Sequence, residues 1–247
     1  MNSRLHFLCA ETKPGKSLLQ KAHEPRVGAY VALIAAIALQ SAVPEEFTPT
    51  PGKYRYWLIA MEVLLLLLLI VSNRVRITRL TAGENTVPGT PLIIVENAVA
   101  RALLVVITIN NAVSAAVLDW RLLHGVQKDQ SAALLFGGGA IFLTNIIVVA
   151  IWYWFHDLGG PSARENGEPY YYPDFLFPQY GINNELAPQE WRPHFLDYLY
   201  VSFTNVVAFS PTDAMPLTKR AKAMMALQSS VAITTVALVF ARAVNVL

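Results

Sequence analysis

The hydrophobic residues of the chain fall into long blocks separated by polar segments. Four blocks are long enough, or nearly so, to span a bilayer, over residues 27–43, 57–72, 100–118 and 132–154, with an earlier start at Leu92 as an alternative for the third. A fifth block, residues 221–247, ends the chain. The hydrocarbon core of a bilayer needs about 20 apolar residues per helix. The pattern therefore predicts an all-α integral membrane protein with about five transmembrane helices.

The segment before the last block has a different pattern. The stretch from Asp197 to Phe209, about 13 residues, makes a helix of only half a bilayer at about 1.5 Å per residue. Pro211 then prevents the helix from continuing, and Thr212 and Asp213 favour a turn. Irregular backbone at membrane depth is tolerated only where it is buried in protein or lines water. We therefore expect a re-entrant half-span, similar to a pore helix, before the last helix.

These blocks divide the chain into a polar arm, a first group of helices and a C-terminal region. The arm is residues 1–26, and the first transmembrane helices occupy residues 27–131. The C-terminal region, residues 132–247, contains an outer helix (132–154), an extramembrane loop (156–193), the re-entrant segment (197–218) and the last helix (221–247). The loop is rich in proline, glycine and aromatic residues, so we expect it to be ordered and packed on the membrane domain.

Composition agrees with a membrane protein and excludes several classes of function. The 247 residues are 54% hydrophobic and 15% charged, against about 25% charged in soluble domains. Mean hydropathy is +0.40. The single cysteine, Cys9, excludes an internal disulfide and a cysteine-based zinc site. A net charge of +2 is too small to indicate a nucleic-acid surface. We expect the lipid bilayer as a partner, and no nucleic acid.

Catalytic chemistry has little support in the sequence. The five histidines show no metal-ligand spacing, and no catalytic or phosphate-binding motif is present. We therefore expect no enzyme activity, no cofactor and no metal site. Ionisable residues inside a span are costly, which makes Glu62 a functional candidate. The alternative is that Glu62 pairs with a neighbouring helix or reaches the interface.

Uncharged polar residues inside the blocks favour packing between helices. Amide and hydroxyl side chains bridge helices in membranes, and small residues let helices approach closely. This interpretation applies to Asn110, Asn111, Thr144 and Asn145, to the group Gln228, Ser229 and Ser230, and to Gly137, Gly138 and Gly139. Gln228 to Ser230 are also functional candidates because of their place in the last block.

The stretch "YLYVSFTNVVAFSPTDAMPLT", residues 198–218, resembles the pore module of potassium-channel-type proteins. Tyr200 and Ser202 match the aromatic-Ser face of the pore helix in that family. Asp213, Pro216 and Thr218 match the Asp-x-x-Pro-x-Thr exit that follows the filter. The resemblance covers roughly the last 115 residues. It implies that residues 132–154 are the outer helix and that residues 221–247 are the inner helix.

The filter itself departs from the family pattern. Ala208, Phe209, Ser210, Pro211 and Thr212 stand where the family has Thr-Val-Gly-Tyr-Gly. The family filter needs glycine backbone geometry to aim its carbonyl groups at the ion. Both glycines are replaced here, which argues against a potassium-selective filter of that type.

The resemblance assigns residues to a pore. The lining of the filter region is predicted to be Thr204, Asn205, Ser210, Thr212 and Asp213, with Asp213 supplying negative charge at one mouth. The cavity lining from the last helix is predicted to be Gln228, Ser229, Thr234 and Thr235.

The whole chain also looks like a class of bacterial membrane proteins. They share a phrase of the type "FLDYLY-SFTN—AFSPTD—PLT", here residues 195–218, and a last helix ending "ARAVN", here residues 241–245. This resemblance implies a multi-pass protein of the bacterial inner membrane, and it carries no activity with it.

Positive charges near the spans predict that the N-terminus lies in the cytoplasm. Lysines and arginines are most frequent in the N-terminal arm and after the second block: Arg4, Lys13, Lys16, Lys21, Arg26, Arg74, Arg76 and Arg79, with Arg101 nearby. The other two short loops carry Lys53, Arg55, Arg121 and Lys128. Four spans would then return the chain to the cytoplasm before the re-entrant segment. The pore resemblance requires the opposite side, and we favour the charge distribution.

Two hypotheses follow. In the first, the protein is an ion-channel-like homo-oligomer, with a tetramer favoured, that forms a pore for a monovalent or divalent cation with a non-standard filter. In the second, the loss of both filter glycines marks a non-conducting membrane scaffold or accessory subunit with a pore-like fold.

Overall fold

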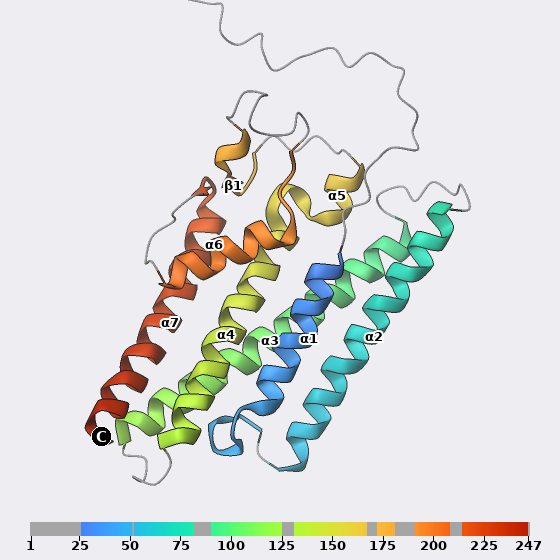
Figure 1. Cartoon of the computed structure of the whole chain (residues 1–247). Coiled ribbons are helices and arrows are strands. Elements are labelled where there is room, and N and C mark those ends of the chain that lie inside the picture. Colours follow the sequence, from blue (N-terminus) through green and yellow to red (C-terminus); the bar gives the residue numbers. More distant parts are fainter. Residues whose placement is uncertain are drawn as a thin grey trace, which may run out of the picture.

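The chain folds into a bundle of helices (Figure 1). The computed structural model describes residues 26–50, 52–81, 90–124, 131–166, 172–180, 191–207 and 214–246. The helices are α1 (Val27–Ala42), α2 (Lys53–Thr81), α3 (Pro91–His124), α4 (Ser131–His156), α5 (Pro161–Asn166), α6 (Phe195–Val207) and α7 (Lys219–Val246). Short 3-10 turns cover Glu45–Phe47, Asp157–Gly159 and Pro178–Tyr180, and the two short strands are β1 (Phe175–Leu176) and β2 (Met215–Pro216).

Within the described residues, four helices are long and apolar enough to cross a membrane. They cover Lys53–Arg79, Pro91–His124, Ala132–Arg164 and Lys219–Arg242. The apolar helix α1 has 16 residues, fewer than the roughly 20 that a bilayer core requires. An all-α fold that contains helices long and apolar enough to span a membrane is therefore confirmed. A total of about five spans and a re-entrant half-span remain predictions.

Helix α2 extends well beyond the apolar block from which it was predicted, whereas α3 begins at Pro91, close to the alternative start at Leu92, and continues past Leu118 to His124. Helix α2 has 29 residues and α3 has 34. At about 1.5 Å per residue, α3 is roughly 51 Å long and exceeds the hydrocarbon core of a bilayer. The extra turns carry arginines such as Arg74, Arg76 and Arg79. Hydropathy detects only the part of a helix that is apolar, so these polar turns were not predicted.

Helix α4 lies at the centre of the bundle and packs against α1, α3, α6 and α7 (Figure 1). Helix α2 packs on α3 and α1 at one side. The main hydrophobic core contains residues from α1, α3 and α4, among them Ala36, Leu103, Ile107 and Ala150, which are almost fully buried. Because α4 lies at the centre, α1, α3, α6 and α7 all pack against it.

Two of the three consecutive glycines in α4 allow close helix packing, as predicted. A Cβ atom on Gly137 would lie 2.9 Å from the ring of Phe47, and one on Gly138 would lie 2.8 Å from a methyl group of Val239 in α7. Gly139 has open space at the same position. The packing role therefore belongs to Gly137 and Gly138.

Successive long helices alternate in direction (Figure 1). The start of one helix therefore lies beside the end of the next, and basic residues at these positions lie at the same end of the bundle. At this end α1, α3 and α7 begin, and α2 and α4 finish. We call it the Arg26 end. Ion pairs at this end join Arg26 and Arg76 to Glu96, and Arg220 to Asp174. The opposite end carries the exposed pair of Arg121 and Glu46, 3.9 Å apart.

Helix α6 crosses α4 and α7 near the Arg26 end (Figure 1). Strand β1, which follows α5, pairs antiparallel with β2, which precedes α7. The segment after α4 and the segment after α6 therefore meet above the start of α7. This part of the molecule, α5 together with β1 and β2, is called the platform.

Candidate functional site

Helix α6 is amphipathic, and its two faces have different environments. Its first turn is capped by Asp197, whose Oδ2 accepts a 2.7 Å hydrogen bond from the backbone N–H of His194. The buried face follows helical spacing through Tyr198, Val201, Ser202 and Asn205. The opposite, exposed face presents Leu196, Tyr200, Phe203 and Val207. The matched pair of the pore resemblance, Tyr200 and Ser202, is thus divided between these faces.

The buried face of α6 is joined to α7 through the side chain of Gln228. Gln228 Oε1 accepts hydrogen bonds from Tyr153 Oη at 2.8 Å and from Asn205 Nδ2 at 2.9 Å. Gln228 Nε2 donates to Ser202 Oγ at 2.6 Å and to the carbonyl oxygen of Ser202 at 3.2 Å. Gln228 is only 3% exposed. Side chains from α4, α6 and α7 therefore satisfy one another inside a single chain.

Backbone carbonyl groups complete this arrangement. Ser202 Oγ donates to the carbonyl of Ile146 at 2.7 Å, and Asn205 Nδ2 donates to that of Met225 at 3.0 Å. Asn145 Nδ2 donates to the carbonyl of Gln228 at 3.3 Å. Buried polar groups are stable only when they are paired in this way. We call Tyr153, Ser202, Asn205 and Gln228, together with these carbonyl contacts, the Gln228 network.

The structure brings together some of the residues predicted to line a pore and separates others. Asn205 and Gln228 belong to the network, and Ser229 Oγ donates to the carbonyl of Asn205 at 3.2 Å. Thr204 bonds back to the carbonyl of Tyr200 at 2.9 Å.

The two threonines of α7 point in different directions. Thr234 is exposed and bonds back to the carbonyl of Ser230 at 2.9 Å. Thr235 is buried against α3, where its Oγ1 lies 3.4 Å from Asp119 Oδ2. One solvent-filled cavity cannot be lined by both faces of the helix. The remaining predicted filter residues, Ala208, Phe209, Ser210, Pro211, Thr212 and Asp213, lie outside the described residues, so their role as a filter remains a prediction.

A second cluster, centred on two buried aspartates, holds the platform to the bundle. Asp157 Oδ1 accepts a 2.6 Å hydrogen bond from the backbone N–H of Asp174, and Asp157 Oδ2 accepts one of 2.6 Å from Tyr198 Oη. Thr218 Oγ1 donates to Asp174 Oδ1 at 2.5 Å, and Arg220 forms an ion pair with the other oxygen of Asp174. We call these residues the aspartate clasp.

Burial raises the pKa of the Tyr198 phenol well above its ordinary value, so the hydroxyl group stays protonated and donates a hydrogen bond to Asp157 Oδ2. The sequence did not indicate this cluster, because Asp157, Asp174 and Tyr198 come from segments that meet only in the folded chain. Gly159 and Gly160, which have positive φ angles, mark the turn after Asp157 that brings this carboxylate to the platform.

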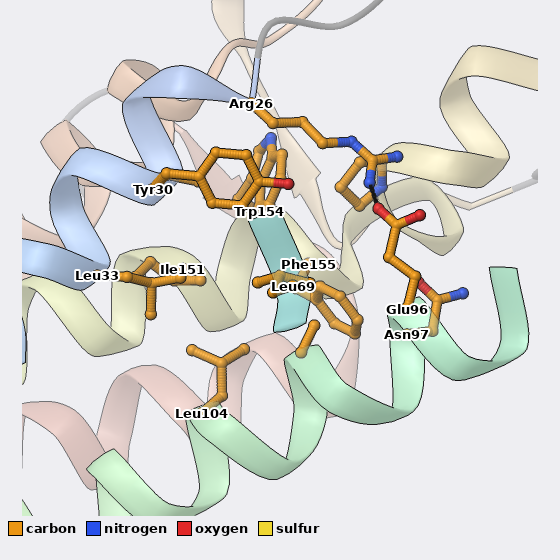
Figure 2. Close-up of a pocket in the computed structure, with 13 residues that line it drawn as sticks. Arg26, Tyr30, Leu33, Leu69, Glu96, Asn97, Leu104, Ile151, Trp154 and Phe155 are labelled. Atoms are coloured by element: carbon orange, nitrogen blue, oxygen red, sulfur yellow. Dashed lines mark hydrogen bonds and ion pairs between the residues drawn. The ribbon is translucent and has the colours of Figure 1, made fainter. Parts of the chain in front are cut away.

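A third polar cluster joins three helices around Glu96 (Figure 2). Arg26, at the start of α1, points its guanidinium at Glu96 of α3. Arg76 Nε of α2 lies 3.3 Å from the other carboxylate oxygen, and Arg26 also donates to Ser162 of α5 at 3.1 Å. All three charged side chains are at least 94% buried. Glu96 thus pairs with distant arginines, whereas its sequence neighbour Arg101 lies over the ring of Phe155.

A small cavity of about 30 Å³ borders this cluster, with Tyr30, Leu33 and Trp154 among its lining residues (Figure 2). That volume holds roughly one or two water molecules and no larger ligand. The Glu96 cluster therefore has the properties of an anchor between helices, with two guanidinium groups around one carboxylate.

Glu62 is the predicted intramembrane ionisable residue, and it is fully buried between α2 and α3. The side-chain amide of Asn110 in α3 interacts with it. Neither carboxylate oxygen has a partner with hydrogen-bond geometry. The predicted alternative, contact with a neighbouring helix, agrees with this position, whereas Glu62 does not reach the interface.

Within the described ranges, no group of histidine, cysteine, aspartate and glutamate side chains is arranged to hold a metal ion. Comparison of the chain with protein-family models, with curated proteins and with solved structures gives no match.

Proposed function

We propose that the protein is a non-conducting membrane scaffold or accessory subunit of the bacterial inner membrane, in which α4, α6 and α7 form a closed block that carries the platform. The observation that carries this proposal is the Gln228 network. A pore needs polar groups that face water, whereas Ser202, Asn205 and Gln228 use their hydrogen-bonding groups on one another within one chain.

The distribution of charge supports an orientation in which the platform lies in the cytoplasm. Arg26, Arg76, Lys219 and Lys222 all belong to the end at which α6 crosses the bundle. Basic residues favour the cytoplasmic side of a membrane. A filter next to α6 would then open to the cytoplasm, which is opposite to the arrangement that the pore resemblance requires.

The platform has surface properties that suit a partner protein. Tyr172, Leu176, Met215 and Leu217 are exposed apolar side chains on or beside β1 and β2. Exposed apolar residues that gather outside the membrane mark interaction surfaces. Lys219 and Lys222 lie close by in sequence, so an acidic partner suits this surface best.

Single-channel recording of the purified protein in planar bilayers tests the proposal. We expect no unitary currents under potassium, sodium or calcium gradients, with a known potassium channel reconstituted in parallel as the positive control. Reproducible unitary currents from the wild-type protein that are absent from empty bilayers would overturn the proposal.

The second candidate is a cation pore at the axis of a homotetramer. The order of α4, α6 and α7 favours it, because it repeats the outer helix, pore helix and inner helix of the channel module. The outer face of α7 adds support: Ala226, Ser230, Thr234 and Ala237 are exposed and small enough for close contact with another copy.

Disulfide crosslinking distinguishes the two candidates. With Cys9 changed to serine, Ser230→Cys provides a single thiol on the outer face of α7. Leu143→Cys provides a matched control on the exposed face of α4. Efficient crosslinking of Ser230→Cys alone would favour an axis lined by α7. Crosslinking of neither variant supports the scaffold.

A further inference from the structure

An open groove of about 560 Å³ lies between α3, α4 and α7, three helices that pack against one another. Its walls are mostly apolar, and they include Val105 of α3 and Val149 of α4. Ile109 and Leu227 at its borders are 58% and 68% exposed, so the groove opens sideways from the bundle. We call it the lateral groove. A ligand that fills it is mainly apolar and enters from the side of the bundle.

Each of the three wall helices carries a basic residue where the groove reaches the Arg26 end. His156, at the end of α4, lines the groove itself. Arg101 precedes the lining residue Val105 by four positions, and Arg220 precedes the lining residue Met224 by four positions. Residues four positions apart lie on the same face of a helix. The two arginines therefore continue the groove-lining faces of α3 and α7 by one turn, toward the end at which His156 lies.

Contacts with the end of α4 hold both arginines beside His156. Arg220 Nη2 donates a hydrogen bond to the carbonyl of His156 at 3.2 Å. The guanidinium carbon of Arg101 lies 5.8 Å from the ring centre of Phe155, the neighbour of His156 in sequence. Both arginines interact electrostatically with His156. The two guanidinium groups, one from α3 and one from α7, thus lie at the last turn of α4, where the lateral groove ends.

The positive charge at this end of the groove is only partly balanced. Asp174 pairs with Arg220, but the side chain of Asp174 is 5% exposed and that of Arg220 is 46% exposed. Arg101 is exposed, and no described residue forms a hydrogen bond or an ion pair with its guanidinium. With His156 neutral, two arginines and one aspartate leave one positive charge on the outer surface. A ligand with one negative charge complements it.

The length of the groove along α4 matches one leaflet of a bilayer. Asn145 lines the groove 11 residues before His156, and that separation corresponds to about 16 Å along the helix. The hydrocarbon core of a bilayer is about 30 Å thick, so one leaflet contributes about 15 Å. An apolar groove of this length with a positive charge at one end has the dimensions and the polarity of a phospholipid site.

We propose that the lateral groove binds an anionic phospholipid, with its phosphate at Arg101 and Arg220 and one acyl chain along the apolar walls. Arginine suits a phosphodiester because the guanidinium offers several N–H donors in one plane. Basic pockets between transmembrane helices on the cytoplasmic side bind anionic head groups, and the Arg26 end is the side that the charge distribution assigns to the cytoplasm. The inference requires that the chain spans a membrane, and it does not depend on whether the protein conducts ions.

Native mass spectrometry of the purified chain tests the proposal. The protein is released from micelles that contain equal amounts of dioleoyl phosphatidylglycerol and dioleoyl phosphatidylcholine, which share their acyl chains and differ in head-group charge. We expect the wild-type protein to retain the anionic lipid about five-fold more than the zwitterionic lipid, the effect of one arginine at a membrane surface. Arg101→Gln should remove this preference, and Arg101→Lys should keep most of it. Arg74→Gln changes an exposed arginine of α2 at the same end and should behave as the wild type.

A second pair of variants tests whether an acyl chain occupies the groove. Ala112 lines the groove, whereas Ala60 is an exposed alanine of α2, a helix that does not line it. Ala112→Phe should fill the groove and abolish the preference for the anionic lipid, and Ala60→Phe should leave it unchanged. Equal retention of the two lipids by the wild-type protein would overturn the proposal. A preference that Arg101→Gln leaves intact would also overturn it, and so would one that survives Ala112→Phe, because the phosphate would then bind without the groove.

Discussion

The Nε2 atom of Gln228 donates a 2.6 Å hydrogen bond to Ser202 Oγ, and this contact fixes α6 across α7. Both residues are almost fully buried. The serine hydroxyl in turn donates a hydrogen bond to the carbonyl of Ile146 in α4. Three helices therefore depend on one glutamine side chain, and this dependence leads to the first prediction.

Replacement of Gln228 by leucine should destabilise the protein strongly. The change leaves the Tyr153 hydroxyl without its partner Gln228, and it removes the Gln228 bonds of Ser202 and Asn205, which keep only their carbonyl contacts. A buried group left unpaired costs about 1–3 kcal/mol. We expect a loss of about 3 kcal/mol in the free energy of unfolding, measured by thermal or denaturant unfolding in detergent. Ser230→Ala, on the exposed face of the same helix, should change stability by less than about 0.5 kcal/mol. Equal effects of the two substitutions would contradict the network.

Two tyrosines of α6 give a matched test of the aspartate clasp. Tyr198→Phe removes the hydroxyl group that donates to Asp157, whereas Tyr200→Phe changes a half-exposed side chain on the other face. A hydrogen bond to a charged group contributes about 1.5–3 kcal/mol, so Tyr198→Phe should lower stability by that amount. Tyr200→Phe should be nearly neutral. Indistinguishable melting temperatures for the two variants would exclude the clasp as a stabilising element.

Glu96 should be far more important for stability than the exposed ion pair at the opposite end. Glu96→Ala removes the carboxylate that the buried Arg26 and Arg76 share, and loss of one partner of a buried ion pair costs about 3–5 kcal/mol. Arg121→Ala removes an exposed pair with Glu46 and should cost about 1 kcal/mol or less. The measurement is the free energy of unfolding in detergent. If Glu96→Ala were as mild as Arg121→Ala, the cluster would not anchor the three helices.

Consecutive glycines of α4 should respond in opposite directions to the same substitution. Gly138→Ala introduces a methyl group 2.8 Å from the stiff side chain of Val239, so α4 and α7 must separate slightly and stability should fall. Gly139→Ala meets open space and should gain up to about 1 kcal/mol from helix propensity. Melting temperatures of the two variants check this. A fall in both would show that Gly139 also contacts a neighbour.

Asp213 still distinguishes the pore from the scaffold by its response to substitution. If it only caps a turn, Asp213→Asn should be nearly silent, since asparagine caps equally well, and Asp213→Ala should cost about 1 kcal/mol. If it lines a cation path, Asp213→Asn should reduce cation flux while assembly stays intact. The two measurements are liposome flux and thermal stability. The scaffold predicts no flux to reduce and a stability loss in the alanine variant.

The helical class and most helices could be predicted from the sequence, because long apolar helices are visible there as uninterrupted apolar blocks. The polar end of α2 could not be predicted, since Arg74, Arg76 and Arg79 continue the helix without adding to its hydropathy. Close packing at Gly137 and Gly138 followed from residue size alone. The open space beside Gly139 could not be predicted, because the sequence does not show which face of the helix is packed.

The candidate site was predicted only in part. Asn205 and Gln228 were recognised as polar residues in apolar segments. Gln228 was also predicted to bridge helices, and its contacts with Ser202 and Asn205 are of that kind. Their partners could not be predicted, because residues from Tyr153 to Gln228 meet only after α4, α6 and α7 have packed. The aspartate clasp was missed for the same reason, since Asp157 and Asp174 belong to separate segments that meet only in the folded chain.

Accessibility of a thiol at position 202 tests most directly whether the Gln228 network is closed. With Cys9 changed to serine, Ser202→Cys is the only thiol in the chain and is close in size to the native residue. The account predicts no modification by a membrane-impermeant thiol reagent from either side of a proteoliposome, until the protein is denatured. Lys222→Cys, which is exposed, should react quickly from one side. Modification of Ser202→Cys in the folded protein at a rate similar to that of Lys222→Cys would show that water reaches the network, and would contradict the account.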